Sequence, residues 1–143
     1  MLVQQISIFL ENKSGRLAEV TKILADNDID ICALSIADTT NFGILRLIVN
    51  KPKEAERVLS ENEFTVSCTD VIAVAVENKP GGVAYVLEIL QSNSISIEYM
   101  YAFLGKIDNE AFVILRVEKP EAALITLKNC DVKVIPSDKI YCK

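Results

Sequence analysis

The 143-residue chain contains no histidine and no tryptophan. Without histidine it cannot form a Ser-His-Asp or Cys-His nucleophilic pair, and it lacks the imidazole ligands on which many zinc sites depend. No P-loop and no Gly-x-Gly-x-x-Gly sequence is present. The four cysteines show no Cys-x-x-Cys spacing; they are Cys32, Cys68, Cys130 and Cys142. The sequence therefore predicts no catalytic site, no metal site and no cofactor, and we expect that the protein is not an enzyme.

Positive charge is also scarce. The formal net charge is −5, which disfavours a nucleic-acid partner because non-specific affinity depends on clustered Lys and Arg. No apolar run approaches the ~20 residues that cross a bilayer, and residues 1–5 lack the basic segment of a secretion signal. We predict no membrane partner and a cytoplasmic protein. Its cysteines have apolar or strand-like neighbours, so buried reduced thiols are expected.

One short motif is present twice. Residues 11–16 read ENKSGR and residues 77–82 read ENKPGG. Each copy follows a run of β-branched residues and precedes apolar residues at helical spacing. Each motif therefore predicts a tight turn that leads from a strand to the N-terminus of a helix. A helix N-terminus offers unpaired N–H groups to a small anion, and glycine lets a ligand approach the backbone. A purely structural interpretation also fits, with Ser14 or Asn78 capping the helix.

The similarity extends beyond the motif. At an offset of 66 residues, identical side chains recur along the predicted helix and strand that follow. Further on, ILR at 44–46 aligns with ILR at 114–116, and Lys51-Pro52 aligns with Lys119-Pro120. The chain is therefore predicted to contain an internal duplication, with domains at residues 1–69 and 70–143.

Each copy is predicted to fold as β-α-β-β-α-β. The fold class is α+β, with two ferredoxin-like units in which helices cover one face of an antiparallel sheet. The last strand of the first copy is expected to run almost directly into the first strand of the second. The predicted strands are 3–10, 29–37, 43–49, a strand that begins near 64, 71–77, 95–104, 111–118 and 131–135. The predicted helices are 15–26, a helix that begins at 52, 81–92 and 120–128. Turns are expected at 38–41 and 105–109, and the tail 136–143 is expected to lie on the surface.

This order of elements, with Asn-x-x-Gly at the first turn, resembles the ACT domain, a small regulatory module of amino-acid metabolism. Residues 78–83 resemble the form found in the regulatory domain of phosphoglycerate dehydrogenase. Residues 12–17 resemble the form found in regulatory subunits of acetolactate synthase. The resemblance covers the whole chain as two tandem ACT units without a catalytic domain.

The resemblance implies a site for a free amino acid at the interface between two ACT units. Asn12 and Asn78 would bind the ligand's polar groups. Backbone N–H groups would receive its carboxylate; they belong to Gly15, Arg16 and Leu17 in the first copy and to Gly81, Gly82 and Val83 in the second. Parts of 31–36 and 97–102 would complete the pocket. In the first copy the bulky Arg16 departs from the pattern, so it would either close that site or add a charge to it.

We therefore expect an allosteric, amino-acid-binding regulatory protein that acts on a partner, such as an enzyme of amino-acid metabolism, and forms a homodimer. The alternative is a regulatory or assembly subunit of a biosynthetic enzyme, with structural turns and no small-molecule ligand of its own.

Overall fold

The computed structural model describes residues 2–11, 13–38, 41–104 and 109–141. The chain divides into two compact units, and each is described by itself. The first unit contains residues 4–69 and Tyr141, and the second contains residues 2–3 and 70–140. Asn12 and most of the two predicted turns at 38–41 and 105–109 lie outside the described residues.

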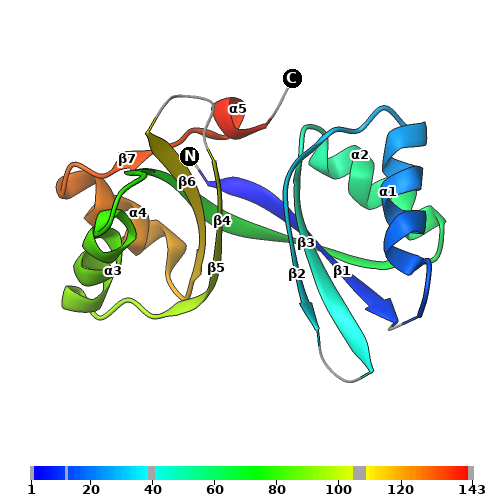
Figure 1. Ribbon diagram of the computed structural model, residues 1–143, viewed down its shortest axis with the longest axis horizontal. Helices are drawn as coiled ribbons and strands as arrows, with labels where there is room; N and C mark the ends of the chain where they lie inside the picture. The colour runs from blue at the N-terminus through cyan, green and yellow to red at the C-terminus, as the bar shows by residue number, and fades with distance from the viewer. Residues whose placement is uncertain (1, 12, 39–40, 105–108, 142–143) are drawn as a thin grey trace. The chain divides into compact units, whose positions relative to one another are not determined.

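The first unit follows the predicted order of elements. They are β1 (Val3–Glu11), α1 (Arg16–Asp26), β2 (Ile31–Asp38), β3 (Phe42–Val49), α2 (Pro52–Glu61) and the beginning of β4 (Thr65–Glu77). The strand order is β2-β3-β1-β4, and β3 runs antiparallel to both β1 and β2. Figure 1 shows α1 and α2 on one side of this sheet. This is the ferredoxin-like arrangement that the sequence predicts.

The second unit repeats that arrangement. It contains the rest of β4, α3 (Gly82–Ser92), β5 (Ile97–Leu104), β6 (Glu110–Val117), α4 (Pro120–Asn129), β7 (Lys133–Val134) and α5 (Ser137–Ile140). Its strand order is β5-β6-β4-β7, with antiparallel pairing throughout. Helices α3 and α4 lie together on one face of this sheet (Figure 1). β4 is a single strand of 13 residues, so the predicted direct passage from one copy into the next is confirmed.

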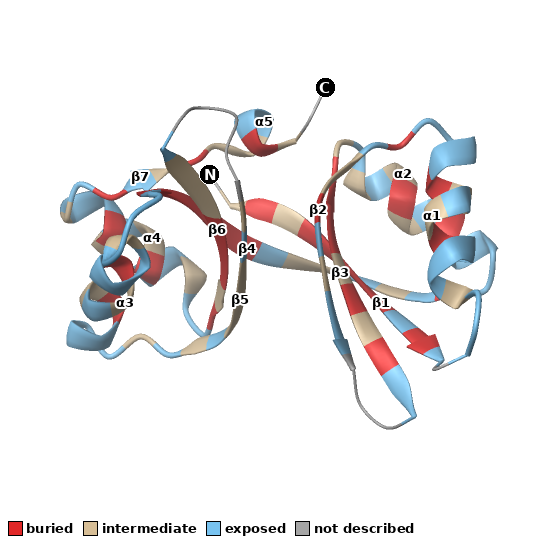
Figure 2. Cartoon of the chain, in the orientation of Figure 1, coloured by how far each residue is buried: buried red, intermediate tan, exposed pale blue. Residues whose placement is uncertain are grey.

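Each unit has its own apolar core between sheet and helices. In the first unit, alternate residues of β1 meet Val20 and Leu24 of α1 and Leu59 of α2, all fully buried. In the second unit, Val86 and Leu90 of α3 hold the equivalent places. Figure 2 shows the buried stripe on each helix facing its sheet and the exposed stripe facing outward. One apolar stripe per helix is what a single covered sheet face requires.

The duplication is visible in backbone detail. Each helix that follows a turn motif ends in the same way, because Asn27 and Asn93 both donate from Nδ2 to a carbonyl four residues earlier at 2.8 Å. Two residues after each asparagine, a backbone N–H donates to the carbonyl five residues earlier. These hydrogen bonds run from Ile29 N to Leu24 O and from Ile95 N to Leu90 O, both at 2.9 Å. The predicted tandem repeat is confirmed.

Two expectations were wrong. The tail does not simply lie on the surface, because it forms the short helix α5 with Ile140 buried, and the Tyr141 hydroxyl accepts a hydrogen bond from Gln4 N at 2.9 Å. Cys68 and Cys130 are half-buried thiols, but Cys32 is disulfide-bonded rather than reduced. An apolar neighbourhood in sequence does not report the oxidation state of a thiol. None of the helices in the described part of the chain is long and apolar enough to span a membrane.

Candidate functional site

Both turn motifs fold in the same way. In the second unit, β4 ends at Glu77 and α3 begins at Gly82. The chain turns through bonds from Lys79 N to Glu77 O at 2.9 Å and from Gly82 N to Lys79 O at 3.1 Å. The first turn repeats both bonds, at 2.7 Å and 3.4 Å. The predicted strand-turn-helix geometry is therefore present in both copies.

The helices begin at glycine rather than at a polar cap. The N-cap residues are Gly15 and Gly81, with φ of 88° and 91°, and neither helix has a side-chain cap. The interpretation of Ser14 or Asn78 as caps was therefore wrong. A left-handed N-cap needs glycine because a Cβ is disfavoured at such φ values. The first N–H group of each helix, at Arg16 or Gly82, donates within the turn. The N–H groups of the next two residues have no intrahelical acceptor and can face a ligand.

Gly82 is required for a different reason. A Cβ at this position would lie 2.1 Å from the backbone oxygen of Glu77, a distance that no side chain tolerates. Gly81, by contrast, has open space around the place of a Cβ. The helix of the second turn thus starts in close contact with the end of the strand that precedes it.

A cavity of about 470 Å³ opens beside this second turn, inside the second unit. It has an apolar wall and a rim of charged residues. Its lining residues are Ala75, Val76, Glu77, Lys79, Gly81, Gly82, Tyr85, Val86, Glu110, Asp131, Val132 and Lys133. Small-molecule sites typically measure roughly 300–1,000 Å³ and combine apolar walls with a few polar groups. The size and lining of this cavity therefore suit a small ligand.

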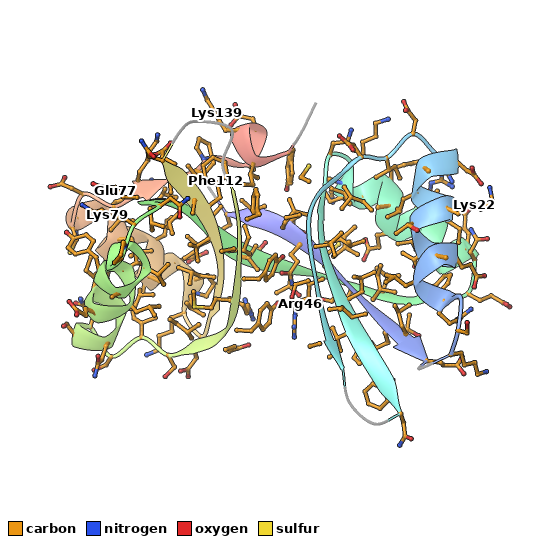
Figure 3. All side chains as sticks on the ribbon, in the orientation of Figure 1. Lys22, Arg46, Glu77, Lys79, Phe112 and Lys139 are labelled. Carbon is orange, nitrogen blue, oxygen red and sulfur yellow. The ribbon has the colours of Figure 1, made fainter. Side chains whose placement is uncertain are left out.

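The charges around the second cavity are partly paired. Lys79 Nζ lies 2.7 Å from Glu77 Oε2, and Lys133 Nζ lies 3.2 Å from Glu110 Oε2. Figure 3 shows Glu77 and Lys79 side by side near the start of α3. The side chains of both lysines are more than half exposed, so their ion pairs are weak and can exchange partners. The rim offers cationic and anionic groups within one small volume.

The first unit has a smaller cavity of about 280 Å³ at its own turn. It is lined by Phe9, Leu10, Glu11, Arg16, Phe42, Glu63, Phe64 and Thr65. Arg16 places its guanidinium 4.5 Å from the centre of the Phe64 ring and pairs with Glu19 at 2.9 Å. Beside this cavity, Lys13 pairs with Glu11 at 2.9 Å, and this hydrogen bond lowers the pKa of the Glu11 carboxyl.

The predicted site residues fall into three groups. Gly81 and Gly82 line the second cavity and Arg16 lines the first. Four others lie beside the turns without lining either cavity, and Asn12 is outside the described residues; the four are Gly15, Leu17, Asn78 and Val83. Asn78 is exposed, and its backbone N–H donates to Asn109 O at 2.6 Å. The ligand role of each of these residues stays a prediction.

Several lining residues of the second cavity were missed from sequence. Glu110 comes from β6, while Asp131 and Lys133 come from the segment around β7. Tyr85 comes from α3, and its hydroxyl donates to Cys130 O at 3.3 Å. Tyr85 is local to the turn, whereas Glu110, Asp131 and Lys133 belong to segments that only the sheet order brings to it. A signal was available, since the fourth strand of a ferredoxin-like unit lies beside the first.

Among the described residues, no group of three or more Cys, Asp or Glu side chains is placed to hold a metal ion. The arrangement is that of a cavity beside a helix N-terminus.

Residues 1–140 match the family described as ACT domain pair, and the chain therefore belongs to this family of regulatory modules. None of the curated proteins is found to be similar to it. Among solved structures, protein BT0572 from Bacteroides thetaiotaomicron is 42% identical, with a TM-score of 0.94 over 100% of this chain and 98% of that one.

Two more distant structures share the fold. The regulatory subunit of aspartate kinase from Thermus thermophilus is 20% identical, with a TM-score of 0.64 over 90% of this chain and 93% of that chain. The corresponding subunit from Thermus flavus is 19% identical, with a TM-score of 0.61 over 92% and 94%. At this identity they support the two-unit ferredoxin-like architecture alone.

Proposed function

We propose that this ACT domain pair binds a free amino acid at the second turn and passes that signal to a partner protein. The observation that carries the proposal is the cavity of about 470 Å³ beside the N-terminus of α3. An amino acid is a small zwitterion, and the cavity sets lysines and carboxylates around an apolar wall. The family membership supports a regulatory role.

The chemistry of recognition follows from the charges. The ligand's carboxylate would accept hydrogen bonds from the N–H groups in the first turn of α3 that have no intrahelical acceptor, and it would approach Lys79 or Lys133. Its ammonium group would lie toward Glu110 or Asp131. The side chain would contact the apolar wall around Val132. A neutral zwitterion satisfies both signs of charge, which a simple anion or cation does not.

A thermal-shift screen of the purified protein against the twenty common L-amino acids tests the proposal. A ligand that binds only the folded state raises the melting temperature, by an amount that grows with the logarithm of its concentration relative to Kd. We expect one amino acid, or a chemically related group, to raise it. If none does at millimolar concentration, the amino-acid-binding function is wrong.

The regulation we propose is allosteric. The ligand would favour one of two states of the protein, by no more than the difference between its affinities for them. We also propose that the ligand binds at an interface between ACT units, that the protein forms a homodimer, and that its partner is an enzyme of amino-acid metabolism. The chain itself would not turn over substrate. Product release from a radiolabelled amino-acid panel, in a preparation free of contaminating enzyme, would contradict this.

The alternative function is a subunit that assembles with a partner and binds no small molecule. Exposed apolar side chains favour this reading, because Leu34 and Ile36 of the edge strand β2 are 55% and 46% exposed. An assembly subunit would show no thermal shift with any amino acid, whereas affinity capture would recover the same enzyme with or without amino acids present.

We also propose that the protein acts in the cytoplasm. Membership of a family of regulatory modules supports this location. Cell fractionation followed by immunodetection of the protein tests the proposal. Recovery of the protein in the membrane or extracellular fraction would contradict it.

A further inference from the structure

The two cavities occupy equivalent places in the two units. β1 pairs Glu11 with Phe42, as β4 pairs Glu77 with Glu110. The third strands of the two units therefore correspond at an offset of 68 residues, so the alignment of ILR at 44–46 with ILR at 114–116 was wrong by two positions. Phe64 N and Val132 N close the same bond, to Leu59 O and Leu127 O, at 3.0 Å in both cases. All eight lining residues of the first cavity thereby have a counterpart lining the second: Phe9 and Ala75, Leu10 and Val76, Glu11 and Glu77, Arg16 and Gly82, Phe42 and Glu110, Glu63 and Asp131, Phe64 and Val132, Thr65 and Lys133.

Arg16 fills part of the first cavity from within the same unit. Its guanidinium lies over the Phe64 ring at 4.5 Å, pairs with Glu19 at 2.9 Å and lies 3.9 Å from Glu11. Only 28% of the side chain is exposed, and its Nε is buried. The cation is therefore held by an aromatic face and carboxylates, the groups that bind a cationic ligand elsewhere.

The second cavity lacks this occupant. Gly82 stands in the place of Arg16, Tyr85 in the place of Glu19 at the same offset, and Val132 in the place of Phe64. The acidic group at the end of the strand is kept, as Glu77. The cavity is correspondingly larger, at about 470 Å³ against about 280 Å³.

We propose that Arg16 is a built-in occupant of the first cavity, so that each chain offers a single open amino-acid site, beside α3. This inference rests on the proposed function for the identity of the ligand, but not for the role of Arg16. It predicts that the two copies of the motif have diverged into one binding turn and one turn closed by its own side chain.

The first test locates the bound ligand. The ¹⁵N-labelled full chain is titrated with each of the twenty common L-amino acids and followed by amide chemical shifts. Any amino acid that binds should saturate at no more than one molecule per chain, with shifts at Gly81, Tyr85 and Asp131. Two bound molecules per chain, or equal shifts at Glu63 and Phe64, would overturn the inference. If no amino acid binds, the proposed function fails, and the second test still decides the role of Arg16.

The second test replaces the missing side chain with a small molecule. Arg16→Ala removes the guanidinium and its two methylenes, which together correspond to the ethylguanidinium ion. Added ethylguanidinium should shift the amides of residues 63–65 in Arg16→Ala and bind there about tenfold more tightly than in wild type, because charge-assisted hydrogen bonds and the ring contact are regained. Arg57→Ala is the matched control, since Arg57 also pairs with carboxylates on a helix surface and lies outside both cavities.

Each outcome decides the proposal. Saturable binding in Arg16→Ala, with wild type and Arg57→Ala both unresponsive at residues 63–65, supports a cavity closed by Arg16. Equal responses in wild type and Arg16→Ala, or no response in Arg16→Ala, would show that Arg16 does not fill a binding volume. If Arg16→Ala loses amide dispersion, Arg16→Gly with propylguanidinium replaces it, because glycine is the residue of the second copy.

Discussion

At the scale of single residues, the two glycines of the second turn are required for different structural reasons. Gly81 supplies a left-handed backbone with open space around it, while Gly82 allows the helix to start against the carbonyl of Glu77. The equivalent position in the first turn carries Arg16, so the two turns differ in how closely helix and strand approach. Sequence alone shows the Gly-for-Arg difference, but not the close contact that makes glycine necessary.

Gly82→Ala should therefore destabilise the protein even without ligand. The added Cβ would lie 2.1 Å from Glu77 O, and moving backbone to relieve such an overlap costs about 1–3 kcal/mol. Chemical denaturation measures the change in the free energy of unfolding. The control is Val83→Ala, one residue further on and 36% exposed, which should change stability by no more than about 0.5–1 kcal/mol. A fully stable Gly82→Ala would mean that the turn is looser than the structure shows.

Asn78→Ala tests the predicted ligand contact. Loss of hydrogen bonds to a charged ligand group should weaken amino-acid binding by about 1–3 kcal/mol. The stability of the free protein should hardly change, because α3 has no side-chain cap for Asn78 to provide. Calorimetric titration with the amino acid that gives the largest thermal shift measures the affinity.

Asn93→Ala is the matched control for Asn78→Ala. The Asn93 side chain donates to Ile89 O at the opposite end of the same helix. Its loss should lower stability by about 0.5–1.5 kcal/mol and leave the affinity unchanged. Equal affinities of wild type and Asn78→Ala would remove Asn78 from the site.

At the scale of the elements, most of the fold was predictable. Alternation in the strands, helical spacing after each turn and Pro52 or Pro120 at a helix start determine the elements, and all are local patterns. The last strand was predicted at 131–135 but contains only Lys133 and Val134. Proline at position 136 and the left-handed backbone of Asp131 limit its pairing. Such limits depend on neighbouring strands, which periodicity does not report.

The candidate site was predictable only in part, for the same reason. The turn motif is local and identifies Gly81, Gly82 and Arg16. The opposite wall of the second cavity, with Glu110, Asp131 and Lys133, comes from segments separated from the turn by about 30 residues or more. Their proximity is a property of the strand order, and their chemistry differs between the two copies. Comparison of the two sequence copies therefore indicates which positions form the opposite wall of the cavity, but not which charges they carry.

The helices that follow the two turns should contribute equally to stability. Leu24 of α1 and Leu90 of α3 hold equivalent positions, at 0% and 1% exposure. Truncating either to alanine should cost about 2–5 kcal/mol, since each would leave a cavity in its own core. Ile125→Ala on α4 is the control, because this side chain is 61% exposed and its loss should cost about 0.5 kcal/mol or less. Thermal or urea denaturation measures all three, and a cost below about 1 kcal/mol at Leu24 or Leu90 would contradict the core assignment.

At the scale of the whole molecule, the edge strand β2 is the feature that favours association with a second chain. It is eight residues long, lies at the end of the first unit's strand order, and exposes Leu34 and Ile36. An exposed apolar edge favours pairing with another strand, and burial of one such side chain stabilises an interface by roughly 1.5–3 kcal/mol.

We therefore predict that the protein sediments as a homodimer at micromolar concentration, and that Ile36→Lys weakens this dimer by at least about tenfold. Ile125→Lys, which adds the same charge at an exposed isoleucine of the second unit, should leave the dimer intact. Sedimentation equilibrium of the three proteins measures the effect, and a monomeric wild type, or equal weakening by both substitutions, would rule out β2 as the dimer contact.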